Sequence, residues 1–159
     1  MLDSEKGVAL HLSIHSLAVQ GREREETGQE LVAQLFRKGR TSYIRYEEEL
    51  EGIGRVMTTL KVEEQQVTII RHGVLRMKHV YRLGEETISQ YETGEGSLIM
   101  KTKTLSLEYT PFEADQLLPT SGASFSNQGR LHLSYHLTLQ DQYVGQFTLE
   151  FNLQPKTTQ

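Results

Sequence analysis

The segment TIIRHGVLRMKHVYR, residues 68–82, gathers side chains that could bind an anion. Its basic or titratable residues are Arg71, His72, Arg76, Lys78, His79 and Arg82. Guanidinium and ammonium groups are common protein partners of phosphate and carboxylate. Aliphatic residues are interleaved with them, however, so the same segment could be only the polar side of a pair of strands. The position of each residue along the strand helps to separate the two interpretations.

Residues beyond Gly73, where we expect a turn or bulge, separate into two alternating sets. One set holds Leu75, Met77, His79 and Tyr81, and the other holds Arg76, Lys78 and Arg82. Because alternate side chains of a strand point to opposite faces, the second set predicts an outward basic stripe. His72 and His79 flank the turn, and we expect both to be solvent-facing polar residues.

Arg71 is the exception, because it alternates in phase with Val67 and Ile69 close to a strand end. Its guanidinium is therefore expected to point into the interior, where a buried charge requires a partner. That partner could be an internal carboxylate such as Glu48, or an anionic ligand. We favour a structural ion pair and keep ligand contact as the alternative.

Three consecutive acids, Glu47, Glu48 and Glu49, could suggest acid–base chemistry. Glycoside hydrolysis needs two carboxylates about 5–10 Å apart across a cleft. Successive strand residues point to opposite faces, so this run does not make such a pair. We expect it to lie at a solvated strand end; if Glu48 pointed inward, it would pair with an arginine.

Two pairs of histidines, His11 with His15 and His132 with His136, are each spaced four residues apart. On a strand this spacing separates the two rings by about 13 Å, whereas a zinc–nitrogen bond is about 2 Å long. Neither pair alone could bind one ion, and a site would need histidines from two paired strands. All four lie opposite the apolar face, so we expect solvent-facing histidines and no metal site.

Signatures of nucleophilic catalysis are absent from the sequence. There is no cysteine and no GxSxG motif. The stretch GEGSL, residues 94–98, resembles a phosphate-binding loop only superficially, because such a loop requires a following helix. We therefore expect a protein that is not an enzyme and has no cofactor.

The dominant sequence period is two, which is typical of half-buried strands. Residues 131–139 and 143–153 alternate strictly between apolar and polar side chains, and the short QDQ link predicts a hairpin; residues 8–15 behave similarly. Further strands are expected at 27–38, 41–49, 54–63, 66–72, 74–82, 86–92 and 96–109. Many antiparallel strands with one apolar face favour a closed barrel, which removes exposed edges.

Some segments depart from this pattern. The charge run at 22–26 is expected to be a solvated loop or a strand end. Within residues 111–129, FEADQLL could form one or two helical turns, and the rest is expected to be a loop. Residues 1–7 and 155–159 are expected to be frayed tails of a single domain spanning 1–159.

Composition limits the partners and the location. The formal net charge of −4 argues against a general nucleic-acid-binding protein. No apolar stretch is long enough for a transmembrane helix, and polar residues interrupt the first apolar run, which argues against a secretory signal. We therefore expect a cytoplasmic protein without nucleic-acid or membrane partners.

Three stretches, GRVMTTLKVEEQQVTIIRHGVLRMKHVY (54–81), TISQYETGEGSLIMKTKT (87–104) and GRLHLSYHLTL (129–139), resemble the YwiB-like proteins of Gram-positive bacteria. RYEEEL (45–50) fits the same pattern, and the similarity covers about residues 8–153. This resemblance implies a lipocalin-like, calycin-type barrel from an uncharacterised bacterial family, and it transfers no ligand or catalytic residue.

Together these observations predict an all-β antiparallel meander that closes into a lipocalin- or calycin-like barrel of about 8–10 strands. The predicted function is non-catalytic binding of a small molecule in the lumen or barrel mouth. Arg71, Tyr135, Phe147 and Phe151 are the candidate ligand-binding residues, although core filling is the commoner role of such aromatic residues. The alternative is a protein-interaction module or homo-oligomer with a filled barrel, which would use an outer sheet face or the basic stripe.

Overall fold

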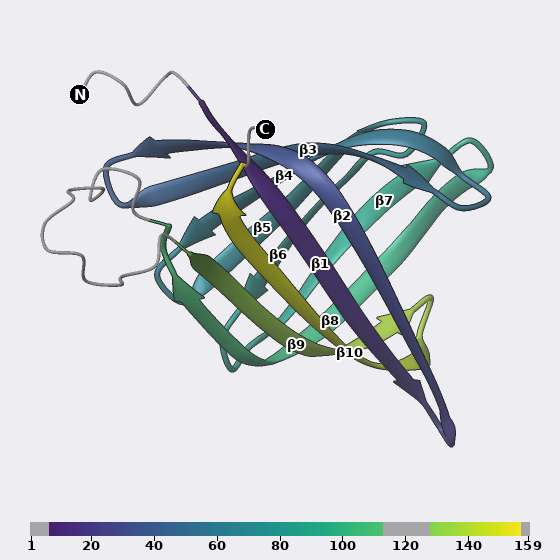
Figure 1. The fold of residues 1–159 in the computed structure, drawn as a ribbon. Helices are drawn as coiled ribbons and strands as arrows, with labels where there is room; N and C mark the ends of the chain where they lie inside the picture. Colours follow the sequence, from purple (N-terminus) through teal and green to yellow (C-terminus); the bar gives the residue numbers. More distant parts are fainter. Residues whose placement is uncertain (1–6, 113–127, 157–159) are drawn as a thin grey trace, which may run out of the picture.

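A single antiparallel sheet of ten strands forms the molecule, and it curls into a nearly closed barrel (Figure 1). The structure is a computed structural model that describes residues 7–112 and 128–156. Its strands are β1 (Val8–Gln20), β2 (Glu23–Lys38), β3 (Thr41–Leu50), β4 (Gly54–Glu63), β5 (Gln66–Gly73), β6 (Met77–Arg82), β7 (Glu86–Thr93), β8 (Gly96–Thr110), β9 (Gly129–Leu139) and β10 (Gln142–Pro155). The predicted all-β barrel is confirmed.

The strands follow one another around the barrel in sequence order. Each strand pairs with the next, except β6 with β7, and β10 pairs with β1 to complete the circuit. Between β6 and β7 the structure has one isolated bridge, between Arg76 and Glu92. We call this interruption the seam of the barrel.

The β9–β10 hairpin shows why the alternating pattern specifies this fold. Leu131 lies opposite Phe151, Leu133 opposite Leu149, and Tyr135 opposite Phe147. These side chains belong to the hydrophobic core or pack against it. The turn places Gln140 and Asp141 at positive φ angles of 50° and 66°, a conformation that tight hairpin turns require. The QDQ link is therefore the predicted hairpin turn.

The first hairpin is longer than the sequence pattern suggested. β1 continues to Gln20, and the charge run 22–26 extends β2, so it forms an exposed strand end. β2 pairs with β3 only from Gln34 to Lys38, which leaves its first half as a free edge. Charged side chains on such an edge oppose pairing with another chain.

Some expectations concern residues outside the described ranges. The helical turn proposed for FEADQLL lies almost entirely within 113–127, and most of the two proposed tails lie within 1–6 and 157–159. Pro155, which we had assigned to a tail, is the last residue of β10. Within residues 7–112 and 128–156, no helix has the length and apolar character needed to cross a membrane.

Candidate functional site

The interior holds an ion pair between Arg71 on β5 and Glu48 on β3. Arg71 Nη2 lies 3.2 Å from Glu48 Oε2, and the Glu48 side chain is only 3% exposed. Thr58 on β4 donates a hydrogen bond of 2.7 Å to the same carboxylate and accepts one of 3.3 Å from Arg71 Nε. The predicted pairing is confirmed, but the expectation of a solvated Glu48 is wrong, because alternation places Glu48 on the inner face with Tyr46.

Burial dominates the electrostatics of Arg71's tyrosine neighbours. Burial alone would lower the pKa of Arg71, but the Glu48 carboxylate and nearby tyrosines raise it above its ordinary value. Burial, followed by the charge of Glu48, raises the pKa of Tyr46, and burial raises the pKa of Tyr81 and Tyr135. The guanidinium therefore stays charged, and the phenols stay protonated at neutral pH.

The three aromatic residues predicted to bind a ligand are packed into the core. The ring centroids of Tyr135 and Phe147 are 5.7 Å apart in a stacked arrangement, and those of Tyr135 and Tyr81 are 4.8 Å apart. Phe151 is 2% exposed. The structure thus brings Arg71 and Tyr135 into one interior cluster, where Phe147 and Phe151 act as filling; whether any of them contacts a ligand stays a prediction.

His79 is fully buried at the seam, so its predicted solvent exposure is wrong. Its Nδ1 lies 2.6 Å from Ser89 Oγ on β7, and its Nε2 lies 2.7 Å from Thr102 Oγ1 on β8. Thr87 on β7 donates a hydrogen bond to the carbonyl oxygen of Val80 on β6. Side-chain bonds thus join strands that the backbone ladder leaves unpaired, and burial lowers the pKa of His79 to about 4.

A hollow with a volume of about 670 Å³ lies at one mouth of the barrel. It is near the β2–β3 and β4–β5 turns, and we call it the mouth hollow. Its apolar wall includes Val62, Leu83, Leu107, Tyr109 and Pro111; its polar wall includes Arg37, Arg40, Ser42, Glu63, Glu64 and Gln65. Arg37 is held by a 2.6 Å hydrogen bond from its Nη2 to the Phe112 carbonyl oxygen.

Our sequence interpretation proposed none of the residues of the mouth hollow as candidate site residues. Arg37 and Arg40 flank a Gly turn, and such strand ends are the local signal that marks a barrel mouth. The contribution of Leu107 and Tyr109 depends on where β8 lies relative to β3 and β4. That placement depends on how the whole sheet closes into a barrel, so no single stretch of sequence predicts it.

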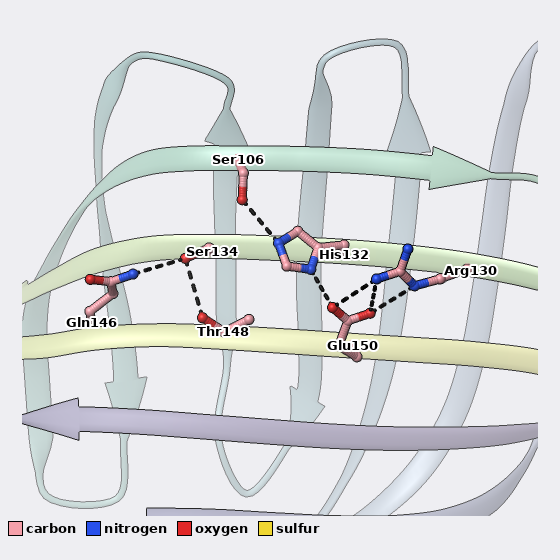
Figure 2. A network of polar contacts seen from close by, with 7 residues as sticks. All are labelled: Ser106, Arg130, His132, Ser134, Gln146, Thr148 and Glu150. Carbon is pink, nitrogen blue, oxygen red and sulfur yellow. Dashed lines mark hydrogen bonds and ion pairs between the residues drawn. The ribbon is translucent and has the colours of Figure 1, made fainter. Parts of the chain in front are cut away.

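A polar network on the outer face of β8, β9 and β10 includes a serine, a histidine and a glutamate in line (Figure 2). Ser106 Oγ lies 3.0 Å from His132 Nε2, and His132 Nδ1 contacts the Glu150 carboxylate. Arg130 donates two hydrogen bonds, of 3.0 and 3.1 Å, to that carboxylate. The order matches a nucleophile, base and acid.

The chemistry of this network is limited by its place on a sheet. Ser106 lies on β8 directly after an irregularity in its pairing with β9, while His132 and Glu150 lie opposite each other in the β9–β10 ladder. Glu150 joins Arg130 and His132 on the neighbouring strand. We interpret the network as a set of side-chain hydrogen bonds that hold β8, β9 and β10 together.

The other surface histidines are separated from one another by the strand register. His11 lies opposite Val32 and Gln154, and His15 lies opposite Gly28 and Glu150. His136 lies opposite Gln146 and Lys103, and its Nδ1 lies 2.8 Å from the Tyr143 hydroxyl. Within the described ranges, no three histidine, aspartate or glutamate side chains are placed to hold a metal ion.

These features define the protein as an antiparallel β-barrel with a packed, partly polar interior. The model of a domain of unknown function, DUF1934, matches residues 12–151, and the chain belongs to this family. Over 66 residues it is 36% identical to the uncharacterized β-barrel protein YwiB of Bacillus subtilis (strain 168). That match covers 42% of this chain and 46% of YwiB, so it spans less than half of the relative's length.

The fold agrees with a solved structure over almost the whole chain. The crystal structure of the ywiB protein from Bacillus subtilis matches with a TM-score of 0.78, covering 99% of this chain and 100% of that chain. The sequence identity is 21%, so this likeness concerns the fold. The resemblance to YwiB-like proteins that the sequence motifs indicated is confirmed.

Proposed function

We propose that this protein is a non-catalytic cytoplasmic barrel, lipocalin-like in character, that binds a small amphipathic anion in the mouth hollow. The observation that carries the proposal is a hollow of about 670 Å³ with one apolar wall and two arginines. Small-molecule sites commonly have this volume and a mainly apolar lining with a few polar groups. The ligand would lie at the mouth, because large side chains occupy the lumen.

The arrangement of the walls suggests how such a ligand would lie. Its apolar body would pack on Leu83, Leu107 and Tyr109, while its anionic group would face Arg40. Arg37 is already anchored to a backbone carbonyl and to Ser42, so it would contribute a fixed positive charge. Glu63 and Glu64, which also line the hollow, would disfavour a ligand with a second anionic group nearby.

A fluorescent dye, 8-anilinonaphthalene-1-sulfonate, is a suitable probe because it combines an aromatic body with one sulfonate. We expect one saturable site, and Arg40→Ser should raise the dissociation constant about tenfold, since it removes one charge-assisted contact. Arg45→Ser is the matched control. Arg45 lies on β3 and is also exposed, but it does not line the hollow. Equal weakening by both variants, or no saturable site, would reject the proposal.

The apolar wall gives a second test. Leu83→Trp should fill part of the hollow and weaken dye binding, and circular dichroism would check that the variant keeps its strand content. Unchanged affinity in a folded Leu83→Trp variant would place the dye elsewhere. Native mass spectrometry of protein purified gently from its own host would then identify a bound species by its release on denaturation.

A second candidate function is protein interaction, favoured by exposed apolar residues on the outer face of β7 and β8. Ile88 and Ile99 are 66% and 52% exposed, and the register makes them diagonal neighbours. Apolar groups clustered on a surface can mark an interface. The same native mass spectrum tests this alternative: a dimer that Ile88→Lys abolishes would support it, and a monomer would leave the mouth hollow as the better candidate.

A further inference from the structure

A second hollow, of about 350 Å³, lies over β5, β6 and β7 at the end of the seam. We call it the basic hollow. Four of its lining residues carry basic side chains, Arg71, His72, Arg76 and Lys78, and Gln90 and Glu92 face them from β7. These residues include most of the basic residues of segment 68–82, which the sequence had marked as either an anion site or a polar strand face.

The charges of this hollow are poorly neutralised by the protein itself. Arg71 pairs with Glu48, whereas Arg76 and Lys78, like several other exposed basic residues, form no ion pair within the described ranges. Glu92 supplies one negative charge to the lining against the two of Arg76 and Lys78. An unbalanced positive site is notable in a chain whose net charge is −4, and it favours an anionic ligand.

The backbone holds the basic residues in place. Arg76 N donates a hydrogen bond of 3.0 Å to the Glu92 carbonyl oxygen, and Glu92 N donates one of 2.9 Å in return. Gly73 has a φ of 132°, and a side chain there would come within 2.7 Å of the Arg55 carbonyl oxygen, so the turn depends on glycine. The backbone of the site is therefore in place before a ligand binds, and only the side chains need to be ordered.

Arg71 connects the basic hollow to the interior. Its Nε and Nη2 are held by Thr58 and Glu48, and its side chain is 25% exposed. A guanidinium has five N–H donors, so the ion pair leaves donors for a ligand. The structural ion pair and the ligand contact, which the sequence presented as alternatives, are therefore compatible, because Thr58 and Glu48 use only part of the guanidinium while Arg71 also lines the hollow.

We propose that the basic hollow binds a phosphate group, either as free phosphate or as the phosphomonoester of a small molecule. Arg71 would supply the oriented guanidinium, Arg76 and Lys78 the neutralising charge, and Gln90 an amide donor. The volume is at the lower end of the range for small-molecule sites, which suits one such group and a short substituent. This proposal is independent of ligand binding at the mouth hollow.

Titration of the intact protein with inorganic phosphate, followed by backbone amide NMR shifts, tests this site. We expect saturable shifts at Gly73, Arg76, Lys78 and Gln90, weakened as salt is raised. The double variant Arg76→Gln with Lys78→Gln should raise the dissociation constant at least about tenfold. Because both residues are exposed, the variant is expected to fold.

The matched control is Arg45→Gln with Lys103→Gln, which removes one arginine and one lysine from exposed positions outside the hollow. It should change the dissociation constant less than about twofold. Equal weakening in both double variants would show only a general charge effect and overturn the proposal. Shifts absent at all four positions, or scattered over the surface, would also overturn it.

Titration with glycerol 3-phosphate distinguishes the two sources of the group. If the ester binds more tightly than inorganic phosphate at the same four amides, the hollow takes a phosphomonoester. If phosphate binds equally or more tightly, the site takes the free anion. Both results support a phosphate site, and loss of both in the Arg76→Gln, Lys78→Gln variant would confirm its place.

Discussion

Thr102 and Thr104 are both buried, inward-facing residues of β8, but their hydroxyls differ in bonding. Thr102 Oγ1 lies 2.7 Å from His79 Nε2, whereas Thr104 Oγ1 has no hydrogen-bond partner among the described residues. Replacing an unpaired buried hydroxyl by a methyl group of similar shape removes a desolvation cost, but breaking a buried bond adds one. Two chemically identical substitutions are therefore expected to have opposite effects.

Thr104→Val should leave the free energy of unfolding unchanged or raise it by up to about 1 kcal/mol. Thr102→Val should lower it by about 1–2 kcal/mol, because His79 then loses its shortest contact to β8. Urea unfolding followed by circular dichroism measures both. A loss of stability in Thr104→Val equal to that in Thr102→Val would contradict the assignment of Thr104 as unpaired.

The ion pair between Arg71 and Glu48 provides the second prediction at the residue scale. Arg71→Leu should cost about 3 kcal/mol of stability, because it leaves the carboxylate of Glu48 buried without its counter-charge. The double variant Arg71→Leu with Glu48→Leu should recover most of this loss, since no charge then stays buried. Chemical unfolding of the single and double variants completes the cycle.

The Arg71→Leu variant also separates the structural role from ligand binding. Loss of phosphate binding with unchanged stability would refute the structural role of Arg71. Loss of stability that the double variant restores, without restoring phosphate binding, is the result expected if the guanidinium serves both roles.

At the scale of elements, the seam between β6 and β7 depends on a neutral histidine. The pKa of His79 is about 4 in the folded protein, against 6.5 for an ordinary histidine. Above pH 6.5 the residue is neutral in both states and contributes no pH dependence. As pH falls from 6.5 to 4, the unfolded chain binds a proton that the folded protein does not, so stability is lost.

The expected loss from His79 over this range is about 3 kcal/mol, at about 1.4 kcal/mol per pKa unit. Carboxylates titrate in the same range, so the measurement compares the native sequence with His79→Gln by urea unfolding between pH 7 and pH 4. The variant should show a shallower loss of stability. His15→Gln, at an exposed histidine, is the control and should keep the native slope.

His79 also shows what the sequence could predict about the strands and what it could not. Strict alternation located β9 and β10 to within two residues at each end. The same alternation placed His79 in phase with Met77 and Tyr81, so its burial could have been predicted. The expectation of exposure came from its proximity to Gly73. For Arg71 and Glu48, alternation was sufficient to suggest the pair, while the bond through Thr58 needed the register of β3 with β4.

Longer-range features were not predictable from local patterns. The sequence favoured a barrel but did not indicate where its circuit is interrupted. Both neighbouring segments, 74–82 and 86–92, read as ordinary strands joined by a short turn. Whether consecutive strands pair depends on the curvature accumulated around the whole sheet, and no residue of the Leu83 to Glu85 turn reveals it. The mouth hollow likewise combines residues that are distant in sequence, from Arg37 to Pro111.

At the scale of the whole molecule, the barrel is expected to have unequal stability around its circumference. β1, β9 and β10 pair with a neighbour on both sides. β6 and β7 each have a ladder on one side only, and across the seam the main connections are side-chain bonds and one bridge. Alternate N–H groups of an antiparallel strand point to each side, so about half of those in each seam strand lack a ladder partner.

We therefore predict that the barrel opens locally at the seam before it unfolds as a whole. In hydrogen–deuterium exchange, peptides covering β6 and β7 should exchange at lower opening free energy than peptides covering β1, β9 and β10. His79→Gln should accelerate exchange in β6 and β7 while leaving β1 and β10 nearly unchanged, because it removes the contacts to Ser89 and Thr102. Uniform protection around the barrel, or an equal effect of His79→Gln on all strands, would mean that the seam is as firmly closed as the hydrogen-bonded ladders. The predicted gradient instead makes the seam, next to the basic hollow, the place where ligand binding would change protection most.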